Sequence, residues 1–270
     1  MAISICKYIC MGKLRKKREM IRSPFEQFEI VSVLGVRLGN IDMSLTNSSI
    51  LMIIGVGLVV GVGRLISFEG GRLVPNRWQS VLEMMYGLVL GMVYESIGKK
   101  RGGDYVGIIF TLFMFILICN MIGLVPYSYT VTAQLIITFT LALGVWVGKL
   151  IVGVRRHGVK LMGMFIPSGA PFGMVPFFVF VEIIGFIIPL VSLSVRLFAN
   201  MMSGHILLKV LFGFAWSMLM SGGILAIVHV VPLTVLFFLV GLETAVAMIQ
   251  AYVFTLLTCI YIGDMESGGH

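Results

Sequence analysis

Five polar side chains interrupt the long apolar runs of the second half of the sequence: Glu182, Arg196, His205, Glu243 and Gln250. A charge at the centre of a bilayer costs about 3 kcal/mol or more and usually marks an ion path. Arginine stays protonated, so it attracts a carboxylate or blocks a path without relaying protons. Carboxylates and imidazole bind and release protons. The combination indicates a protein that conducts protons and keeps a permanent positive charge beside their path.

Helical spacing groups these residues by face. Arg196 and Asn200 are four residues apart and share a face. Glu243 and Gln250 are seven apart and share a face of a second helix. His205, nine residues after Arg196, points to roughly the opposite face of the first helix. The spacing therefore predicts that polar groups project from both sides of the first helix.

Glu182 returns to nearly the same face as Arg196, about 21 Å away along the axis. Three structural alternatives stay open at this stage. Arg196 can be a structural cation paired with Glu182 or Glu243, His205 can simply hydrogen-bond a backbone carbonyl, and Glu243 can be a packing partner of His205.

Two apolar stretches carry these side chains, at about 171–220 and 224–262. A helix of 39 residues would be about 58 Å long, against a hydrocarbon thickness of about 30 Å. Each stretch is therefore either two upright spans that turn at Pro189 or Pro232, or one tilted helix bent at its proline. No polar turn surrounds either proline, so we expect two long tilted helices that form a hairpin around 221–223.

The first half predicts upright spans at about 48–68, 105–124 and 131–152. Residues 76–98 mix charged and apolar side chains, which indicates an amphipathic helix lying at the membrane interface.

The composition requires a bilayer. The 270 residues are 59% hydrophobic and 12% charged, whereas soluble domains are about 45–50% apolar and about 25% charged. Only helices and closed barrels satisfy their backbone groups in lipid, and these runs are far longer than barrel strands. We predict an all-α polytopic membrane protein, with a basic arm or removable leader at 1–24 and a single membrane domain at 25–270.

Charge and cysteine content exclude several other functions. The net charge is +8, and its basic clusters are expected in loops, where they set topology or contact anionic headgroups. No polar domain presents them to nucleic acid. The four cysteines indicate neither a disulfide framework nor a metal site, and no cofactor is expected. Residues 144–149 lack the spacing and the Ser or Thr of a P-loop, so no ATP site is predicted in this chain.

Several stretches resemble subunit a of the F-type ATP synthase. The signature SLSVRLFANMMSGH lies at 192–205, a loop sequence at 120–128 and a final helix at 241–257. The stretches 23–30 and 73–80 are similar to the mitochondrial, plant-like branch. The resemblance covers about residues 23–264. The family also has two long tilted helices at this place.

The resemblance implies a role for each motif residue. Arg196 would be the essential cation facing the proton-binding carboxylates of a rotating c-ring. Asn200 would lie one turn away, and Gln250 would oppose Arg196 from the second helix.

Four further residues would line two aqueous half-channels. Glu182 would line the half-channel open to the matrix. His205 and Glu243 would lie in the half-channel from the intermembrane side, with Asp264 at its mouth.

The resemblance also implies partners and a location. They are a c-ring of proteolipid subunits, the peripheral stalk and other membrane subunits, in a complex that can dimerise. Nucleotide chemistry would lie in partner subunits. His205 paired with Glu243 is the mitochondrial arrangement and favours the inner mitochondrial membrane. The alternatives are a proton-coupled secondary transporter, which would show internal repeats, and a non-conducting assembly subunit, which leaves the buried charges unexplained.

Overall fold

The computed structural model describes residues 32–35, 37–38, 41–42, 44–68, 77–125, 130–158 and 174–267. The arm predicted at 1–24 lies outside these residues. The division into an arm and a single membrane domain stays a prediction.

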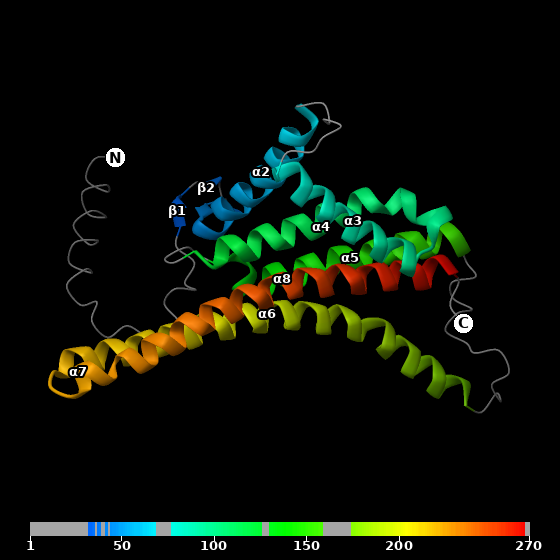
Figure 1. Cartoon of the computed structure of the whole chain (residues 1–270). Helices are drawn as coiled ribbons and strands as arrows, with labels where there is room; N and C mark the ends of the chain where they lie inside the picture. The colour runs from blue at the N-terminus through cyan, green and yellow to red at the C-terminus, as the bar shows by residue number, and fades with distance from the viewer. Residues whose placement is uncertain are drawn as a thin grey trace.

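The first half of the described chain is a set of helices joined in sequence (Figure 1). They are α2 (Asn47–Phe68), α3 (Arg77–Ser96), α4 (Lys99–Gly123), a 3-10 turn η3 (Val131–Ala133) and α5 (Leu135–His157).

Two basic clusters expected in loops are instead helical. Lys99, Lys100 and Arg101 form the first turn of α4, and Arg155 and Arg156 lie in the last turn of α5. The long aliphatic stems explain the difference, because they let a cationic head reach a polar surface from the end of a helix. The expectation that these clusters lie in loops is therefore wrong.

The second half is a hairpin of two long helices, α6 (Val175–Ser221) and α8 (Val230–Ser267), with the short α7 (Leu225–Val228) between them. The chain turns at Gly222 and Gly223, whose φ angles are 69° and 63°. Glycine adopts this left-handed backbone at little cost. The predicted hairpin is confirmed.

Pro189 lies inside α6, where the helix continues past it. Figure 1 shows α6 as one curved helix whose first turns bend away from the neighbouring helices. A proline removes one backbone hydrogen bond and bends a helix without necessarily ending it. One bent helix, rather than two spans with a turn, is the observed solution.

Within the described residues, five helices are long and apolar enough to cross a membrane: α2, α4, α5, α6 and α8. The amphipathic α3 is not among them. The prediction of an all-α polytopic membrane protein is confirmed, while the interfacial position of α3 stays a prediction.

Four short strands precede α2 in the part of the chain that the structure describes. They are β1 (Ser32–Leu34), β2 (Arg37–Leu38), β3 (Ile41–Asp42) and β4 (Leu45–Thr46). β1 pairs with β4, and β2 with β3, in two antiparallel ladders. Gly and Asn separate β2 from β3 in the sequence, and both residue types favour two-residue hairpin loops.

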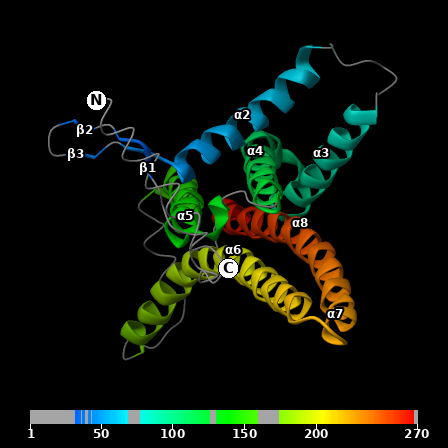
Figure 2. The same cartoon turned by 90° about the vertical axis from the view of Figure 1, so that its left-hand side faces the viewer.

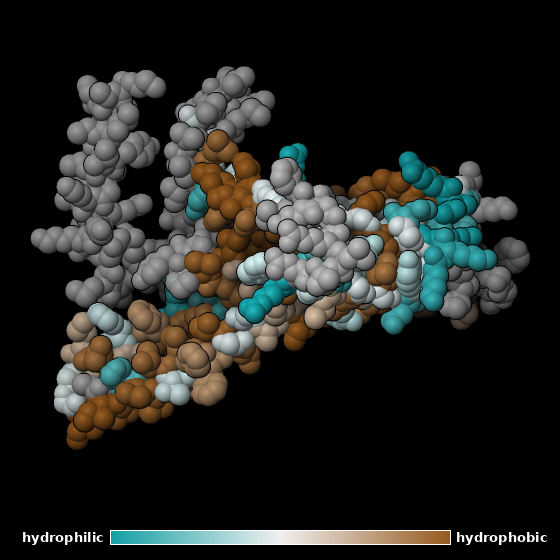
Figure 3. Space-filling view, turned by 45° about the horizontal axis from the view of Figure 1, so that its top comes forward, coloured by the Kyte–Doolittle hydropathy of each residue, from teal (hydrophilic) through white to brown (hydrophobic). Residues whose placement is uncertain are grey.

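The helix α8 is central to the packing. It contacts α3, α4, α5 and α6, while α4 also contacts α2 and α3 (Figure 2). The main apolar core joins α3, α4, α5, α6 and α8, and includes Val93, Phe113, Leu197 and Phe254. In the view of Figure 3 hydrophobic side chains cover most of the surface, and hydrophilic ones gather at the end where α4 begins and α5 and α8 end. The packing therefore fixes α6 against α8, the two helices that carry the candidate site residues.

Candidate functional site

Two polar pairs set the register between α6 and α8. Asn200 Nδ2 donates a hydrogen bond to Gln250 Oε1 at 2.8 Å. His205 Nε2 lies 3.8 Å from Glu243 Oε1. Since the numbers rise along α6 while they fall along α8, the helices are antiparallel. This register brings four of the predicted residues together.

The His205–Glu243 pair is held by a third element. Thr130 Oγ1, just before η3, lies 2.8 Å from His205 Nε2 and shares a hydrogen bond with it. Glu243 is only 6% exposed, and neither of its oxygens has a hydrogen-bond partner within the described part of the chain. The alternative that His205 merely bonds a backbone carbonyl is not what the structure shows.

Gly204 makes room for the Glu243 carboxylate. A Cβ atom at Gly204 would lie 2.7 Å from Glu243 Oε1 and 3.0 Å from its carboxyl carbon. Real Cβ atoms do not approach other atoms this closely. The absence of a side chain on α6 therefore allows the acid on α8 to reach His205.

Asn120 extends the polar cluster onto α4. It is fully buried, and its Nδ2 donates to the carbonyl oxygen of Ala247 at 3.2 Å. Among the described residues, four further buried side-chain atoms form no hydrogen bond: Asn120 Oδ1, Gln250 Nε2 and Thr132 Oγ1 near this cluster, and Glu266 Oε1 at the end of α8. A buried polar atom without a hydrogen bond costs about 1–3 kcal/mol. Such atoms are therefore suited to bind water molecules that complete their hydrogen bonds.

Arg196 is different, because it faces outward. Its side chain is exposed on α6 beside the exposed apolar residues Val191 and Val195. It forms no ion pair with any residue that the structure describes, Glu182 and Glu243 included. The alternative of an internal structural ion pair is therefore not supported. A cation on an apolar outer face is suited to an acidic group from outside the chain.

Glu182 and Asp264 lie on the other side of Arg196 from His205. Both are exposed, and both interact electrostatically with Lys149 of α5. The antiparallel hairpin requires this arrangement, because the beginning of α6 lies against the end of α8. The sequence hypothesis put Asp264 at the mouth of the His205 channel, and the structure corrects it by placing Asp264 at the Glu182 end.

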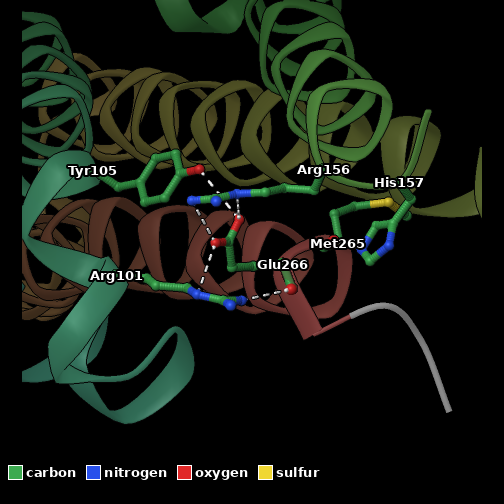
Figure 4. A network of polar contacts seen from close by, with 6 residues as sticks. All are labelled: Arg101, Tyr105, Arg156, His157, Met265 and Glu266. Atoms are coloured by element: carbon green, nitrogen blue, oxygen red, sulfur yellow. Dashed lines mark hydrogen bonds and ion pairs between the residues drawn. The ribbon is translucent and has the colours of Figure 1, made fainter.

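Glu266 is a buried acid that the sequence hypothesis did not identify. It is 4% exposed, and its carboxylate accepts from Arg156 Nε at 3.0 Å and lies 2.8 Å from Arg156 Nη2 (Figure 4). Arg101 Nε lies 3.4 Å from the same carboxylate, and Tyr105 donates to it at 3.4 Å. His157 Nε2 lies 3.0 Å from the carbonyl oxygen of Met265. These contacts fasten the end of α8 to α4 and α5.

No group of three or more His, Cys, Asp or Glu is placed to hold a metal ion in the described ranges. The expectation of a metal-free, cofactor-free chain stays a prediction.

Comparison with known proteins identifies the family of this arrangement. The profile of the family described as "ATP synthase A chain" matches residues 49–263. Curated relatives named "ATP synthase subunit a" include those of Chondrus crispus, 47% identical over 91% of this chain and 96% of the relative, and of Marchantia polymorpha, 44% identical over 91% and 98%. The relative from Pylaiella littoralis is 45% identical over 91% of this chain and 98% of its own length. The chain therefore belongs to the ATP synthase subunit a family.

Proposed function

We propose that this chain is the proton-carrying stator subunit of an ATP synthase, with two aqueous half-channels that meet the c-ring on either side of Arg196. The outward guanidinium of Arg196, which forms no ion pair with the residues that the structure describes, carries this proposal. The proton-binding groups lie on both sides of it along the hairpin, with His205 and Glu243 towards the turn and Glu182 and Asp264 towards the open end.

The first half-channel uses the cluster near the hairpin turn. A proton passes His205 and Glu243. The buried carboxylate oxygens of Glu243 accept no hydrogen bond from the described residues, which suits a hydrated path. The proton then neutralises a carboxylate of the c-ring. A neutral carboxyl group crosses the lipid during rotation because the large desolvation cost of the charge has been removed.

The second half-channel receives the proton after nearly a full turn. The carboxyl group gives up its proton beside Glu182, with Asp264 at the same end. Arg196 then attracts the ionised carboxylate and blocks direct proton flow between the channels, since its own proton does not leave. The Asn200–Gln250 hydrogen bond, one turn from Arg196, holds the two helices in register at this crossing.

The proposal includes partners and a location. The chain contacts a ring of small proteolipid subunits, the peripheral stalk and other membrane subunits, in a complex that can dimerise. The relatives from Chondrus crispus, Marchantia polymorpha and Pylaiella littoralis, together with the His205–Glu243 order, support the inner mitochondrial membrane. Nucleotide chemistry belongs to other subunits.

The test is Arg196→Ala in membranes that carry the assembled complex. We expect ATP-driven proton pumping to be lost, and the passive proton leak to rise once the water-soluble head is stripped. Arg155→Ala, at an exposed arginine of α5, is the matched control and retains pumping. Normal pumping with Arg196→Ala would overturn the proposal and favour a non-conducting assembly role.

A further inference from the structure

Thr130 is a buried polar residue to which the proposed proton path assigns no role. It is 3% exposed and directly precedes the 3-10 turn η3. A threonine that precedes a helical turn commonly bonds its hydroxyl to the backbone N–H groups of that turn, which otherwise lack a partner. The Thr130 side chain forms no such bond, although its carbonyl oxygen accepts from the Ala133 N–H at 3.2 Å. The partner of the hydroxyl therefore lies outside the turn.

That partner is the imidazole of His205. Thr130 Oγ1 lies 2.8 Å from His205 Nε2, which is a hydrogen-bond distance. Glu243 Oε1 lies 3.8 Å from the same nitrogen, which is too far for a hydrogen bond. The contact that holds this ring nitrogen is therefore the one to Thr130 and not the one to Glu243.

Packing contacts hold Thr130 itself in place. Gly123, at the end of α4, leaves the space that the threonine side chain fills. A Cβ atom at Gly123 would lie 2.7 Å from Thr130 Cγ2 and 3.4 Å from its Oγ1. The turn η3 is fixed against α6 and α8 because Ala133, Met201 and Ala247 are buried together in one apolar cluster. The hydroxyl thus reaches His205 from a position that three helices define.

A hydroxyl suits this position because it can both donate and accept a hydrogen bond. An imidazole nitrogen without a proton accepts a hydrogen bond, and the same nitrogen donates one when it carries a proton. The Thr130 hydroxyl can rotate to match either state, whereas an ionised carboxylate such as that of Glu243 can only accept. The bond between Thr130 and Nε2 can therefore persist while a proton arrives at this nitrogen and leaves it.

We infer that Thr130 is a positioning residue for His205, and that its hydroxyl holds the imidazole beside Glu243 in both protonation states. The inference rests on the proposed function, in which protons pass His205 and Glu243. A hydrogen bond to one ring nitrogen fixes the orientation of the ring and the nitrogen that carries the proton. Without the hydroxyl, the imidazole would turn away from Glu243 more readily, and proton transfer between the two groups would slow because it requires close approach.

The experiment compares Thr130→Val with Thr130→Ser in the assembled complex. Valine keeps the branched shape and the methyl group that packs against Gly123 but removes the hydroxyl, whereas serine keeps the hydroxyl and removes the methyl group. Proton conduction is measured through membranes stripped of the water-soluble head, at a fixed driving force and per assembled complex. We expect Thr130→Val to lower conduction at least about tenfold. Thr130→Ser should restore most of the conduction.

Thr255→Val is the matched control. Thr255 is also fully buried, but its Oγ1 donates to the carbonyl oxygen of Ala251 on its own helix at 2.8 Å. This variant should conduct normally. An equal loss in Thr255→Val and Thr130→Val would overturn the inference, because removal of any buried hydroxyl would then explain the effect.

A threonine that acts only by packing would give the opposite order. Thr130→Val would then conduct normally and Thr130→Ser would be the weaker variant, and this result would overturn the inference. Equal conduction by the two variants would also overturn it. If Thr130→Val does not assemble, Thr130→Ala replaces it in the comparison, because alanine and serine differ only in the hydroxyl.

His205→Ala is measured in parallel to separate the inference from the proposed function. Normal conduction in His205→Ala would overturn the proposed path itself. Lost conduction in His205→Ala beside normal conduction in Thr130→Val would overturn the Thr130 inference alone.

Discussion

Gly204 controls how closely the Glu243 carboxylate approaches α6. We expect Gly204→Ala to push Glu243 away from His205, because the added Cβ would lie 2.7 Å from Oε1. A displacement of about 1 Å at a reacting group can cost about 100-fold, so ATP-driven proton pumping should fall at least about tenfold. Pumping by membranes with normal amounts of assembled complex is the measurement.

The same helix offers a control for this substitution. A Cβ at Gly213 would meet nothing within 4 Å. Alanine is also the better helix former, by about 1 kcal/mol. Gly213→Ala should therefore assemble and pump normally. Equal pumping by the two alanine variants would show that Glu243 does not need its present position.

Residue type alone predicts some of the site and not the rest. Arg196 and Glu243 are recognisable because a charge in an apolar run is rare. Asn120 and Glu266 are not, because their partners are distant in sequence: Asn120 bonds Ala247, 127 residues away, and Glu266 pairs with arginines 110 and 165 residues earlier. Single-helix spacing gives no information on such contacts.

At the level of helices, Glu266 fastens three helix ends together. Its carboxylate contacts Arg101 at the start of α4 and Arg156 at the end of α5. We expect Glu266→Gln to lower the thermal dissociation midpoint of the detergent-solubilised complex by a few degrees, about 2–4 °C. The effect is moderate because both arginine side chains are about half exposed and can be hydrated when the charge is lost.

The matched control for this prediction is an acid on the surface of α3. Glu83 accepts an exposed hydrogen bond from Gln79 one turn earlier. Glu83→Gln should leave the midpoint nearly unchanged, as exposed substitutions usually do. If Glu266→Gln had the same midpoint as the unmodified complex, the three helix ends would be held by apolar packing alone.

The long helices were predictable from what their sequences lack. No polar turn surrounds Pro189, and glycines occupy positions 222 and 223, so the sequence favours one bent helix ending in a hairpin. The beginning of α4 was less predictable. The charges of Lys99–Arg101 obscure a helix that starts there, because hydropathy measures preference for lipid, not backbone conformation. The short strands before α2 depend on pairing, which local pattern does not show.

At the scale of the whole molecule, the antiparallel hairpin decides which site residues are neighbours. The resemblance assigned Asp264 to the channel of His205 and Glu243. Pairing of Asn200 with Gln250 fixes the register and carries Asp264 past Arg196 to the Glu182 end. Assigning a role to each residue separately does not reveal how the two helices are aligned. One hydrogen bond between the helices does.

This register predicts from which side of the membrane each group is reached. In a background without native cysteines, Glu182→Cys and Asp264→Cys should react with a membrane-impermeant maleimide from one side of sealed vesicles, and His205→Cys from the opposite side. Phe237→Cys is the control. Its side chain is 77% exposed on an apolar face of α8, so it should contact lipid and react from neither side. Labelling of Asp264→Cys from the same side as His205→Cys would instead place both residues in one channel and contradict the two-ended arrangement of the hairpin.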